Sequence, residues 1–345
     1  MSSHDAEGPG SAEDGLFGIA SSWESSTLVV LPLPWEVSVS FRTGTARGPQ
    51  AVRAASPQLD LYDPDFPDAW KAGIFSLEES EHCTALNRKL RPRVAEHLRL
   101  LEQGYPGNPA LTAEVNEATE SLRSWVFEQT DRIFEAGKIP AILGGEHSVP
   151  LGAYQSAIQR HPEMGLLQID AHADLRVAYE GFEHSHASIM HNALESGLKR
   201  LIQVGLRDFS PAEAERMRND KRILALPDAT IKGKQFEGGS WNQICREIVG
   251  ALPEKVWISL DIDGLDPSLA PNTGTPVPGG LGFAEASHLF GEVVRSGRTL
   301  IGFDLCEVAP DNRLNSRQLE GSWDANVGAR MLFRLASLAI GSQQS

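Results

Sequence analysis

The sequence predicts an α/β protein, with one domain built on a mainly parallel sheet that helices cover on both faces. From residue 138 onward, short apolar runs typical of buried strands alternate with segments whose apolar residues recur at helical spacing. Three of the apolar runs end close to histidine or aspartate residues. The carboxyl ends of parallel strands meet at one edge of a sheet, where ligand sites form. The pattern therefore predicts the fold class and the position of a site together.

The chain starts with a segment that differs from the rest. Residues 1–22 are rich in serine, glycine, aspartate and glutamate and contain few apolar residues. A segment of this composition buries little apolar surface, so we expect a disordered acidic leader. It lacks the basic start and the apolar stretch of a signal peptide. Residues 23–345 are expected to form the single domain.

The first strand is expected at residues 27–34, which form an apolar run. After a loop, Gly48-Pro49 opens a short helix at residues 50–55. The loop at residues 35–47 follows a strand and carries polar or basic side chains, namely Ser38, Ser40, Arg42 and Thr43. We expect it either to contact substrate or to serve as a packing or interface loop, and the sequence leaves both open.

An irregular segment and two long helices come next. Residues 59–74 contain Pro64 and Pro67 and show no regular period, which suits a lid or a subunit contact. Helices are expected at residues 78–103 and 111–136. In the second, apolar residues recur at helical spacing and predict a core face rather than a chemical site.

The remaining chain alternates between strands and helices. We expect strands at residues 139–143, 165–170, 201–205, 222–226, 256–261 and 299–304. Helices are expected at residues 149–160, 187–197, 211–219, 241–252 and 283–296, and a last helix at 321–338 closes the fold. The sequence shows no internal repeat and no linker to a second domain.

Composition excludes several classes of partner. The net charge of −15 disfavours nucleic acid and anionic membranes and is consistent with a cationic substrate. The 3 cysteines are too few and too scattered for a disulfide framework or a thiolate metal site. No apolar stretch reaches the length of a membrane span. We therefore expect a cytoplasmic protein that binds neither nucleic acid nor membrane.

One short stretch carries three potential metal ligands. Residues 166–174 begin as an apolar strand and end with Asp170, His172 and Asp174 at spacing i, i+2, i+4. In an extended chain alternate residues share one face, so these three side chains can point at one position. A lone aspartate at a strand end is usually a turn former. Three converging ionisable groups, however, would repel one another or remain poorly solvated without a cation.

Two other strand ends repeat this design. Residues 256–263 end with Asp261 and Asp263, and the run from residue 139 leads to His147. With these additions, the candidate ligands are two imidazoles and four carboxylates. Such a set suits two divalent ions. Mn²⁺ is expected first, Ni²⁺ or Co²⁺ fit the same ligands, and Zn²⁺ fits less well because it favours fewer, tetrahedral ligands.

These motifs resemble the ureohydrolase family, which includes arginases, agmatinases and related guanidino-group hydrolases. The resemblance covers roughly residues 28–338 and rests on motifs in a fixed order. They are Gly144-Gly145-Glu146-His147-Ser148, Asp170-Ala171-His172-Ala173-Asp174, the run from Ser259 to Pro267 with its continuation to Gly280, and Gly302-Phe303-Asp304-Leu305-Cys306-Glu307. The resemblance implies an arginase-like fold: a single three-layer α/β/α domain with a mainly parallel sheet of about eight strands. It also implies a homotrimer or homohexamer.

The resemblance assigns roles to the candidate residues. One ion would be bound by His147, Asp170, Asp174 and Asp261, and the other by His172, Asp170, Asp261 and Asp263. Asp174 would also accept a hydrogen bond from the attacking water, so it counts as catalytic. Glu307 would hold the guanidinium, and His186 would contact substrate and carry a proton to the leaving amine. His184 is the rival for this last role.

Two departures concern the substrate. Residues 187–190, Ala-Ser-Ile-Met, replace the Gly-Thr-Xaa-Phe pattern of agmatinases and the Asn-bearing pattern of arginases. Val277 stands where a glutamate is common. The chain is nearer to agmatinase or guanidine hydrolase-type members than to arginase, so guanidine, agmatine or another short alkylguanidine is expected as substrate. The alternatives are a metal-dependent deacetylase-like amidohydrolase, or a non-catalytic structural subunit of a mixed oligomer.

Overall fold

A single eight-stranded sheet forms the centre of the molecule. The computed structural model describes residues 10–11 and 14–343. The strands are β1 (Leu28–Leu33), β2 (Ile74–Ser76), β3 (Ile139–Gly144), β4 (Gly165–Ile169), β5 (Arg200–Val204), β6 (Ile223–Leu226), β7 (Lys255–Asp261) and β8 (Thr299–Cys306). Their order is β2-β1-β3-β8-β7-β4-β5-β6, and each neighbouring pair is parallel.

Ten α-helices of the described residues connect and cover the strands. They are α1 (Gly48–Ala55), α2 (Glu81–Glu102), α3 (Pro109–Glu135), α4 (Leu151–Arg160), α5 (Ile189–Glu195), α6 (Pro211–Asn219), α7 (Asp228–Phe236), α8 (Trp241–Gly250), α9 (Phe283–Arg295) and α10 (Trp323–Ser342). Several begin at clear sequence signals. Ser210 and Ser240 form capping boxes with the third residue of α6 and α8, and Asn108 caps α3 ahead of Pro109.

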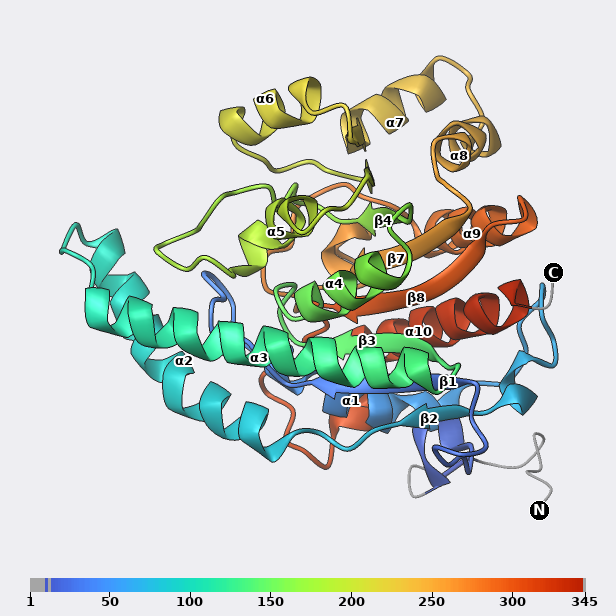
Figure 1. Ribbon diagram of the computed structural model, residues 1–345, viewed down its shortest axis with the longest axis horizontal. Helices are drawn as coiled ribbons and strands as arrows, with labels where there is room; N and C mark the ends of the chain where they lie inside the picture. The colour runs from blue at the N-terminus through green and yellow to red at the C-terminus, as the bar shows by residue number, and fades with distance from the viewer. Residues whose placement is uncertain (1–9, 12–13, 344–345) are drawn as a thin grey trace.

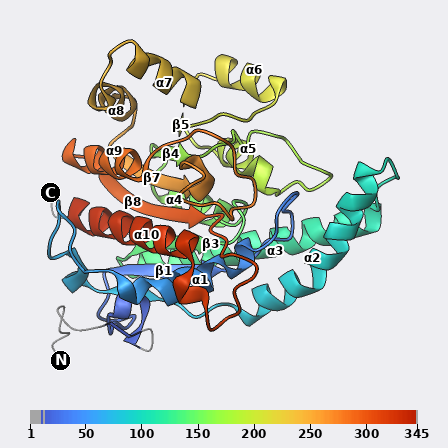
Figure 2. The ribbon, with the colours of Figure 1, turned by 180° about the vertical axis from the view of Figure 1, so that it is seen from behind.

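The sheet separates two apolar cores. Successive strand residues face opposite sides, so Leu28 and Val30 of β1 join one core while Leu31 and Leu33 join the other. The first core also contains apolar residues of α1, α8, α9 and α10, and the second those of α2 to α5. Figures 1 and 2 show α3 and α4 on one side of the sheet and α10 on the other. The predicted three-layer α/β/α architecture is confirmed.

Two short elements were not predicted. Residues 59–74 were expected to be irregular up to their end, yet β2 begins at Ile74 and pairs with β1 at the sheet edge. α7 was missed as well. It begins after Pro227 without a side-chain cap and contains Thr230 and Gly233, which are weak helix formers. β2 is too short, and α7 has no side-chain cap, for either element to be predicted from the sequence.

The predicted leader, residues 1–22, falls partly outside the described residues. Within it, Leu16, Phe17 and Ile19 are buried in the first core, and the Phe17 ring centroid lies 5.2 Å from that of Phe333 on α10. A disordered leader does not describe this part, because three apolar side chains hold it against the domain. For residues 1–9 and 12–13 the leader stays a prediction.

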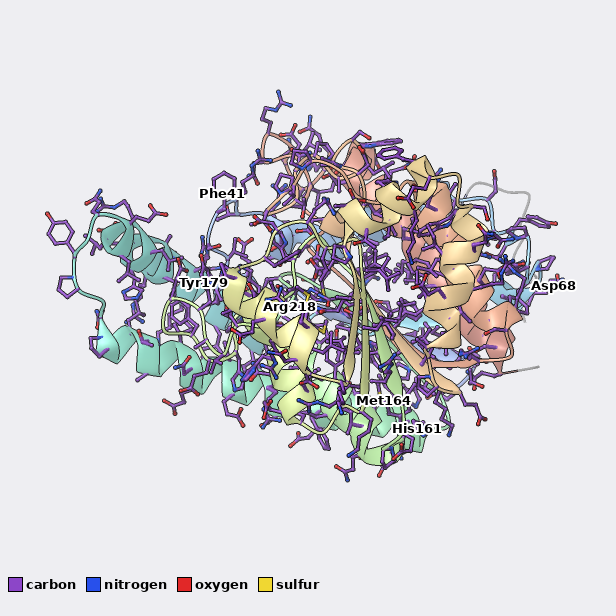
Figure 3. The ribbon with its side chains drawn as sticks, turned by 90° about the horizontal axis from the view of Figure 1, so that it is seen from above. Phe41, Asp68, His161, Met164, Tyr179 and Arg218 are labelled. Carbon is purple, nitrogen blue, oxygen red and sulfur yellow. The ribbon has the colours of Figure 1, made fainter. Side chains whose placement is uncertain are left out.

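The four central strands bring the predicted motifs together. β3, β8, β7 and β4 are neighbours in that order, and Asp261 at the end of β7 is in register with Cys306 of β8. Figure 3 shows the two ends of the strands: Phe41 and Tyr179 lie in loops that follow β1 and β4, and Met164 lies before β4, away from both. Within the described residues, no helix is long and apolar enough to cross a membrane. The predicted motifs therefore meet at the carboxyl edge of the sheet.

Candidate metal centre and active site

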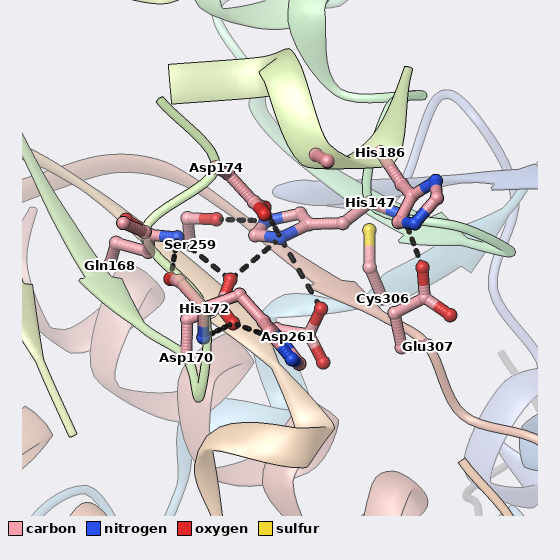
Figure 4. A network of polar contacts seen from close by, with 12 residues as sticks. His147, Gln168, Asp170, His172, Asp174, His186, Ser259, Asp261, Cys306 and Glu307 are labelled. Carbon is pink, nitrogen blue, oxygen red and sulfur yellow. Dashed lines mark hydrogen bonds and ion pairs between the residues drawn. The ribbon is translucent and has the colours of Figure 1, made fainter. Parts of the chain in front are cut away.

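His147 lies at the centre of a first group of ligand-type side chains. Its Nδ1 is 3.0 Å from Asp170 Oδ2, 3.2 Å from Asp174 Oδ2 and 3.3 Å from Asp261 Oδ2. All four side chains are buried. His147 follows β3, Asp170 and Asp174 follow β4, and Asp261 is the last residue of β7, as the sequence predicts (Figure 4).

A second group lies next to the first. His172 Nδ1 is 3.1 Å from Asp263 Oδ2 and 3.6 Å from Asp170 Oδ1. Ligand atoms of His147, Asp170 and Asp261 lie within 4.8 Å of one another, and so do those of Asp170, His172 and Asp263. Asp170 thus belongs to both groups, so it could contribute a ligand to each of two ions. Asp261, the other predicted bridge, contributes to the first group.

The hydrogen bonds of His147 test whether these residues fit a metal ion. Ser259 Oγ donates to Asp304 Oδ1 at 2.9 Å, so it must accept from His147 Nε2 at 2.8 Å. This places one hydrogen on Nε2 and makes Nδ1 the ring nitrogen that a metal ion could use. Nδ1 is buried and aligned with none of the three carboxylates for a hydrogen bond. Burial lowers the pKa of His147, but the three carboxylates outweigh it and raise that pKa well above its usual value, so a positive charge is favoured at Nδ1. This position fits a shared cation, with Ser259 and Asp304 as supporting groups of the His147 ring.

The protonation behaviour of the cluster also indicates that a cation belongs there. Burial and the nearby carboxylates raise the pKa of Asp261 well above its usual value, and burial with Asp170 raises the pKa of Asp174 to about 7. Burial alone would lower the pKa of His172, but Asp263 and Asp170 outweigh it and raise it to about 12. The fold therefore holds negative charge that protons or metal ions must balance.

Two site residues have backbone conformations that are rare outside glycine. Asp174 has φ 53° and Glu307 has φ 62°, both in the left-handed region. The Asp174 carbonyl accepts hydrogen bonds from two backbone N–H groups of α5, and the Glu307 N–H donates to Gly145 O at 2.7 Å. Gly145 itself admits no side chain, because a Cβ there would lie 2.1 Å from Trp35 O. These contacts aim both carboxylates at the site.

Glu307 and His186 lie at the same cavity, which has a volume of about 270 Å³. Glu307 Oε1 accepts the His147 N–H at 2.8 Å. Burial and the Glu146 carboxylate raise the pKa of Glu307 well above its usual value, so a cation beside it would be stabilised. Burial, and after it the positive charges nearby, lower the pKa of His186 to about 3, which keeps its ring neutral. His184 instead points to α3, with Nε2 3.3 Å from Glu120 Oε2.

The outer wall of the cavity contains residues that the sequence did not single out. They are Arg176, Tyr179, Asp208, Phe209, Ser210, Glu213 and Thr275. From the loop at residues 35–47, only Ser40 lines the cavity, while Arg42 donates to Pro271 O. Of residues 187–190 only Ala187 lines it, because Ile189 and Met190 are buried in the second core. The departure at residues 187–190 therefore changes the wall at one position.

Comparisons with known proteins identify relatives of the chain by sequence and by fold. The chain is 32% identical over 294 residues to the N(1)-aminopropylagmatine ureohydrolase of Thermus thermophilus, covering 85% of this chain and 86% of that one. It is 30% identical over 291 residues to the agmatinase of Halalkalibacterium halodurans, covering 84% and 86%. The agmatine ureohydrolase structure of Thermoplasma volcanium shares the fold, with a TM-score of 0.69, 23% identity and coverage of 92% and 91%.

The fold and the site define a ureohydrolase, a hydrolase that acts on carbon–nitrogen bonds. The arginase family profile matches residues 26–335. The chain belongs to the arginase family, and within it is closer to agmatinase-type members than to arginase.

Proposed function

We propose that this chain is a binuclear-metal hydrolase that cleaves a C–N bond of a small guanidino compound. The products are urea and an amine, or urea and ammonia when guanidine itself is the substrate. One observation carries the proposal: two groups of metal-ligand side chains that share Asp170 lie at one cavity with Glu307 and His186. Carboxylate-rich ligation supports Mn²⁺, with Ni²⁺ or Co²⁺ as alternatives.

Glu307, Asp174 and His186 each have a separate role in the proposed reaction. When bound, two divalent ions would lower the pKa of a shared water and so supply the nucleophile at neutral pH. Glu307 orients the guanidinium by accepting a charge-assisted N–H hydrogen bond at its second oxygen, since its first oxygen, Oε1, already accepts the backbone N–H of His147. Asp174 accepts a hydrogen bond from the attacking water. His186, neutral and at the cavity wall, carries a proton to the leaving nitrogen.

The side chains that line the cavity favour a short substrate without an α-carboxylate. Asp208 is exposed at the wall and offers a partner for a positively charged tail, such as the ammonium group of agmatine. Arg176 lies 3.9 Å from Glu213 and stacks on the Tyr179 ring. An α-carboxylate left unpaired here would lose on the order of 1–3 kcal/mol. We therefore expect arginine to be a poor substrate.

A substrate panel tests the proposal. Urea release is measured on arginine, agmatine, guanidinobutyrate, guanidine and a biguanide, with the metal content of Mn²⁺- and Ni²⁺-loaded protein determined in the same samples. Agmatine or guanidine is expected to lead in kcat/KM, with about two ions per chain. Guanidinobutyrate in the lead would show that Arg176 pairs with a tail carboxylate. Absence of urea from every guanidine, with two ions bound, would refute the reaction.

The same panel, with an acetylated amine added, tests the rival functions. A deacetylase-like amidohydrolase needs one ion, and the second ligand group around His172 argues against it. A non-catalytic subunit has no need for intact ligands together with Glu307 and His186. Release of acetate from an acetylated amine, without urea from any guanidine, would favour the first rival.

A further inference from the structure

Glu146 is fully buried beside His147, and the proposed reaction gives it no role. Its carboxylate accepts three hydrogen bonds from neighbouring groups. Ser38 N donates to Oε2 at 2.8 Å, Ser38 Oγ donates to Oε1 at 2.8 Å, and Ser148 Oγ donates to Oε1 at 2.6 Å. Two of the three bonds come from Ser38, in the loop after β1. A buried carboxylate with this many donors organises the groups around it.

The Ser38 hydroxyl connects this carboxylate to His186. Its oxygen accepts from the His186 N–H at 3.0 Å and lies 3.2 Å from His186 Nδ1. A hydroxyl has one hydrogen, and here it is donated to Glu146. Two lone pairs would face each other at 3.2 Å if Nδ1 were bare. Nδ1 must therefore carry the ring hydrogen.

The other ring nitrogen then has no hydrogen. His186 Nε2 lies 3.5 Å from Ser40 Oγ, and both residues line the cavity. We propose that Glu146 and Ser38 are positioning residues that fix the tautomer of His186, so that Nε2 can accept a proton from the attacking water and return it to the leaving nitrogen. The inference rests on the proposed function and adds two residues to it.

One neighbour offers the opposite arrangement. Ser185 Oγ lies 3.3 Å from His186 Nδ1 and accepts from Ala187 N at 3.3 Å. If Ser185 donated its hydroxyl hydrogen to Nδ1, the ring hydrogen would be on Nε2 and Ser38 would have no role. The Glu146 carboxylate favours the first arrangement, because it orients the Ser38 hydroxyl away from the ring.

Kinetic variants distinguish the two arrangements. Ser38→Ala is expected to lower kcat roughly 10-fold to 100-fold, with KM and metal content unchanged. Ser38→Thr keeps the hydroxyl and should restore most of the rate. Ser148→Ala is the matched control, since it removes one hydrogen bond to the same carboxylate but does not touch His186. A Ser38→Ala variant as active as the wild type, or a larger loss of kcat in Ser185→Ala, would overturn the proposal.

A second measurement does not depend on activity. Nitrogen chemical shifts of ¹⁵N-histidine protein loaded with diamagnetic Zn²⁺, assigned with His186→Ala, report which ring nitrogen carries hydrogen. We expect Nδ1 in the wild type. In Glu146→Gln an amide N–H can face Ser38, whose hydroxyl then turns to Nδ1, so the hydrogen should move to Nε2. Hydrogen on Nε2 of the wild type would refute the inference. A wild type that carries the hydrogen on Nδ1 but releases no urea from any guanidine would refute the proposed function and the proton transfer at Nε2. The assignment of the His186 tautomer to Glu146 and Ser38 would stand.

Discussion

Asp261 shows how strongly single residues of the site depend on a cation. Its pKa is raised by burial and by the charges of Asp263 and Asp170, so a bound ion would favour its ionised form. Asp261→Asn removes one ligand charge, and we expect kcat/KM to fall by more than about 100-fold, beyond the range for a residue that only supports a ligand. Metal content and urea release measure this. Asp266→Asn, in the same motif but half-buried and bonded to Ser268 N, should retain activity.

The two histidines of residues 184–186 give a sharper comparison. His186 lines the cavity and His184 contacts Glu120. His186→Ala should lower kcat by roughly 10²-fold to 10⁴-fold, the usual range for an acid–base residue, while His184→Ala should leave it within about twofold. Rates of urea release at saturating substrate decide between them. A silent His186→Ala variant beside an inactive His184→Ala variant would reverse the assignment.

Residue spacing was sufficient to predict the ligand groups but not the residues that support them. Asp170, His172 and Asp174 converge because an extended chain points alternate residues one way. Ser259 and Asp304 hold the His147 ring, yet their contact depends on β7 and β8 being neighbours in the sheet. Sheet order is a long-range property that a single sequence does not display. Ser259 and Asp304 each lie within a motif of the resemblance, but the motifs do not indicate that the two side chains meet at His147.

At the scale of elements, the fold was predictable where a segment was long or well capped. α6 matches its predicted range, residues 211–219, because Ser210 and Pro211 mark its start. The buried central strands were found from their apolar runs. β2 has three residues at the sheet edge, and α7 lacks a side-chain cap, so neither gave a clear pattern. The sequence did not predict which side chains of residues 187–190 face the cavity. Their directions depend on the turn that precedes α5.

The irregular segment between α1 and β2 is tied to α10 by a buried ion pair. Arg334 Nη1 donates to both Asp63 oxygens at 2.7 Å, and both side chains are nearly inaccessible. Arg334→Leu would leave the Asp63 charge buried without its cation, and we expect unfolding free energy to fall by about 3–5 kcal/mol. Denaturant unfolding measures the change.

Two variants serve as controls for this ion pair. Asp63→Asn, added to Arg334→Leu, should recover part of the loss, because the remaining buried charge is removed. Arg330→Leu lies one turn earlier on α10, where, among the described residues, Arg330 donates hydrogen bonds only to Asn326 of its own helix. It should lower the unfolding free energy by roughly 1 kcal/mol or less. Equal losses in Arg330→Leu and Arg334→Leu would contradict a specific role for the pair.

For the whole molecule we propose a closed oligomer, a homotrimer or homohexamer. Tyr62, in the segment between α1 and β2, is 66% exposed, and large exposed apolar side chains are available for contacts between copies. Light scattering at working concentration should give three or six times the chain mass of 37.5 kDa. A mass equal to that of one chain would refute the proposal. Tyr62→Glu should weaken association if this segment lies at the interface.

The stability of the whole molecule should also report the metal site through its pH dependence. In the metal-free chain, burial raises the pKa of Asp174 from 3.8 to about 7. Between these two pKa values the Asp174 carboxyl holds more protons in the folded chain than in the unfolded chain. By linkage, its contribution to stability is greatest at the acidic end and is lost as pH rises through about 7. The raised pKa values of Asp261 and His172 act in the same direction. The pKa of His186, lowered from 6.5 to about 3, acts in the opposite direction between these two values, so the loss of stability is expected mainly above about pH 6.5.

Divalent ions compete with these protons for the same carboxylates and imidazoles, so their stabilising effect should grow as pH rises from about 5 to 8. At a free Mn²⁺ concentration about 100-fold above its Kd, binding contributes about 2.7 kcal/mol, which corresponds to a rise in Tm of about 4 °C for a chain of this length. Thermal unfolding with Mn²⁺ and with a chelator, at three pH values, measures both effects. Asp174→Asn should flatten the metal-free profile, because it removes one of the titrating carboxylates. A metal-free chain that gains stability from pH 5 to 8 would show that the cluster is already balanced by charges within the protein, and that no metal ion is needed to neutralise it.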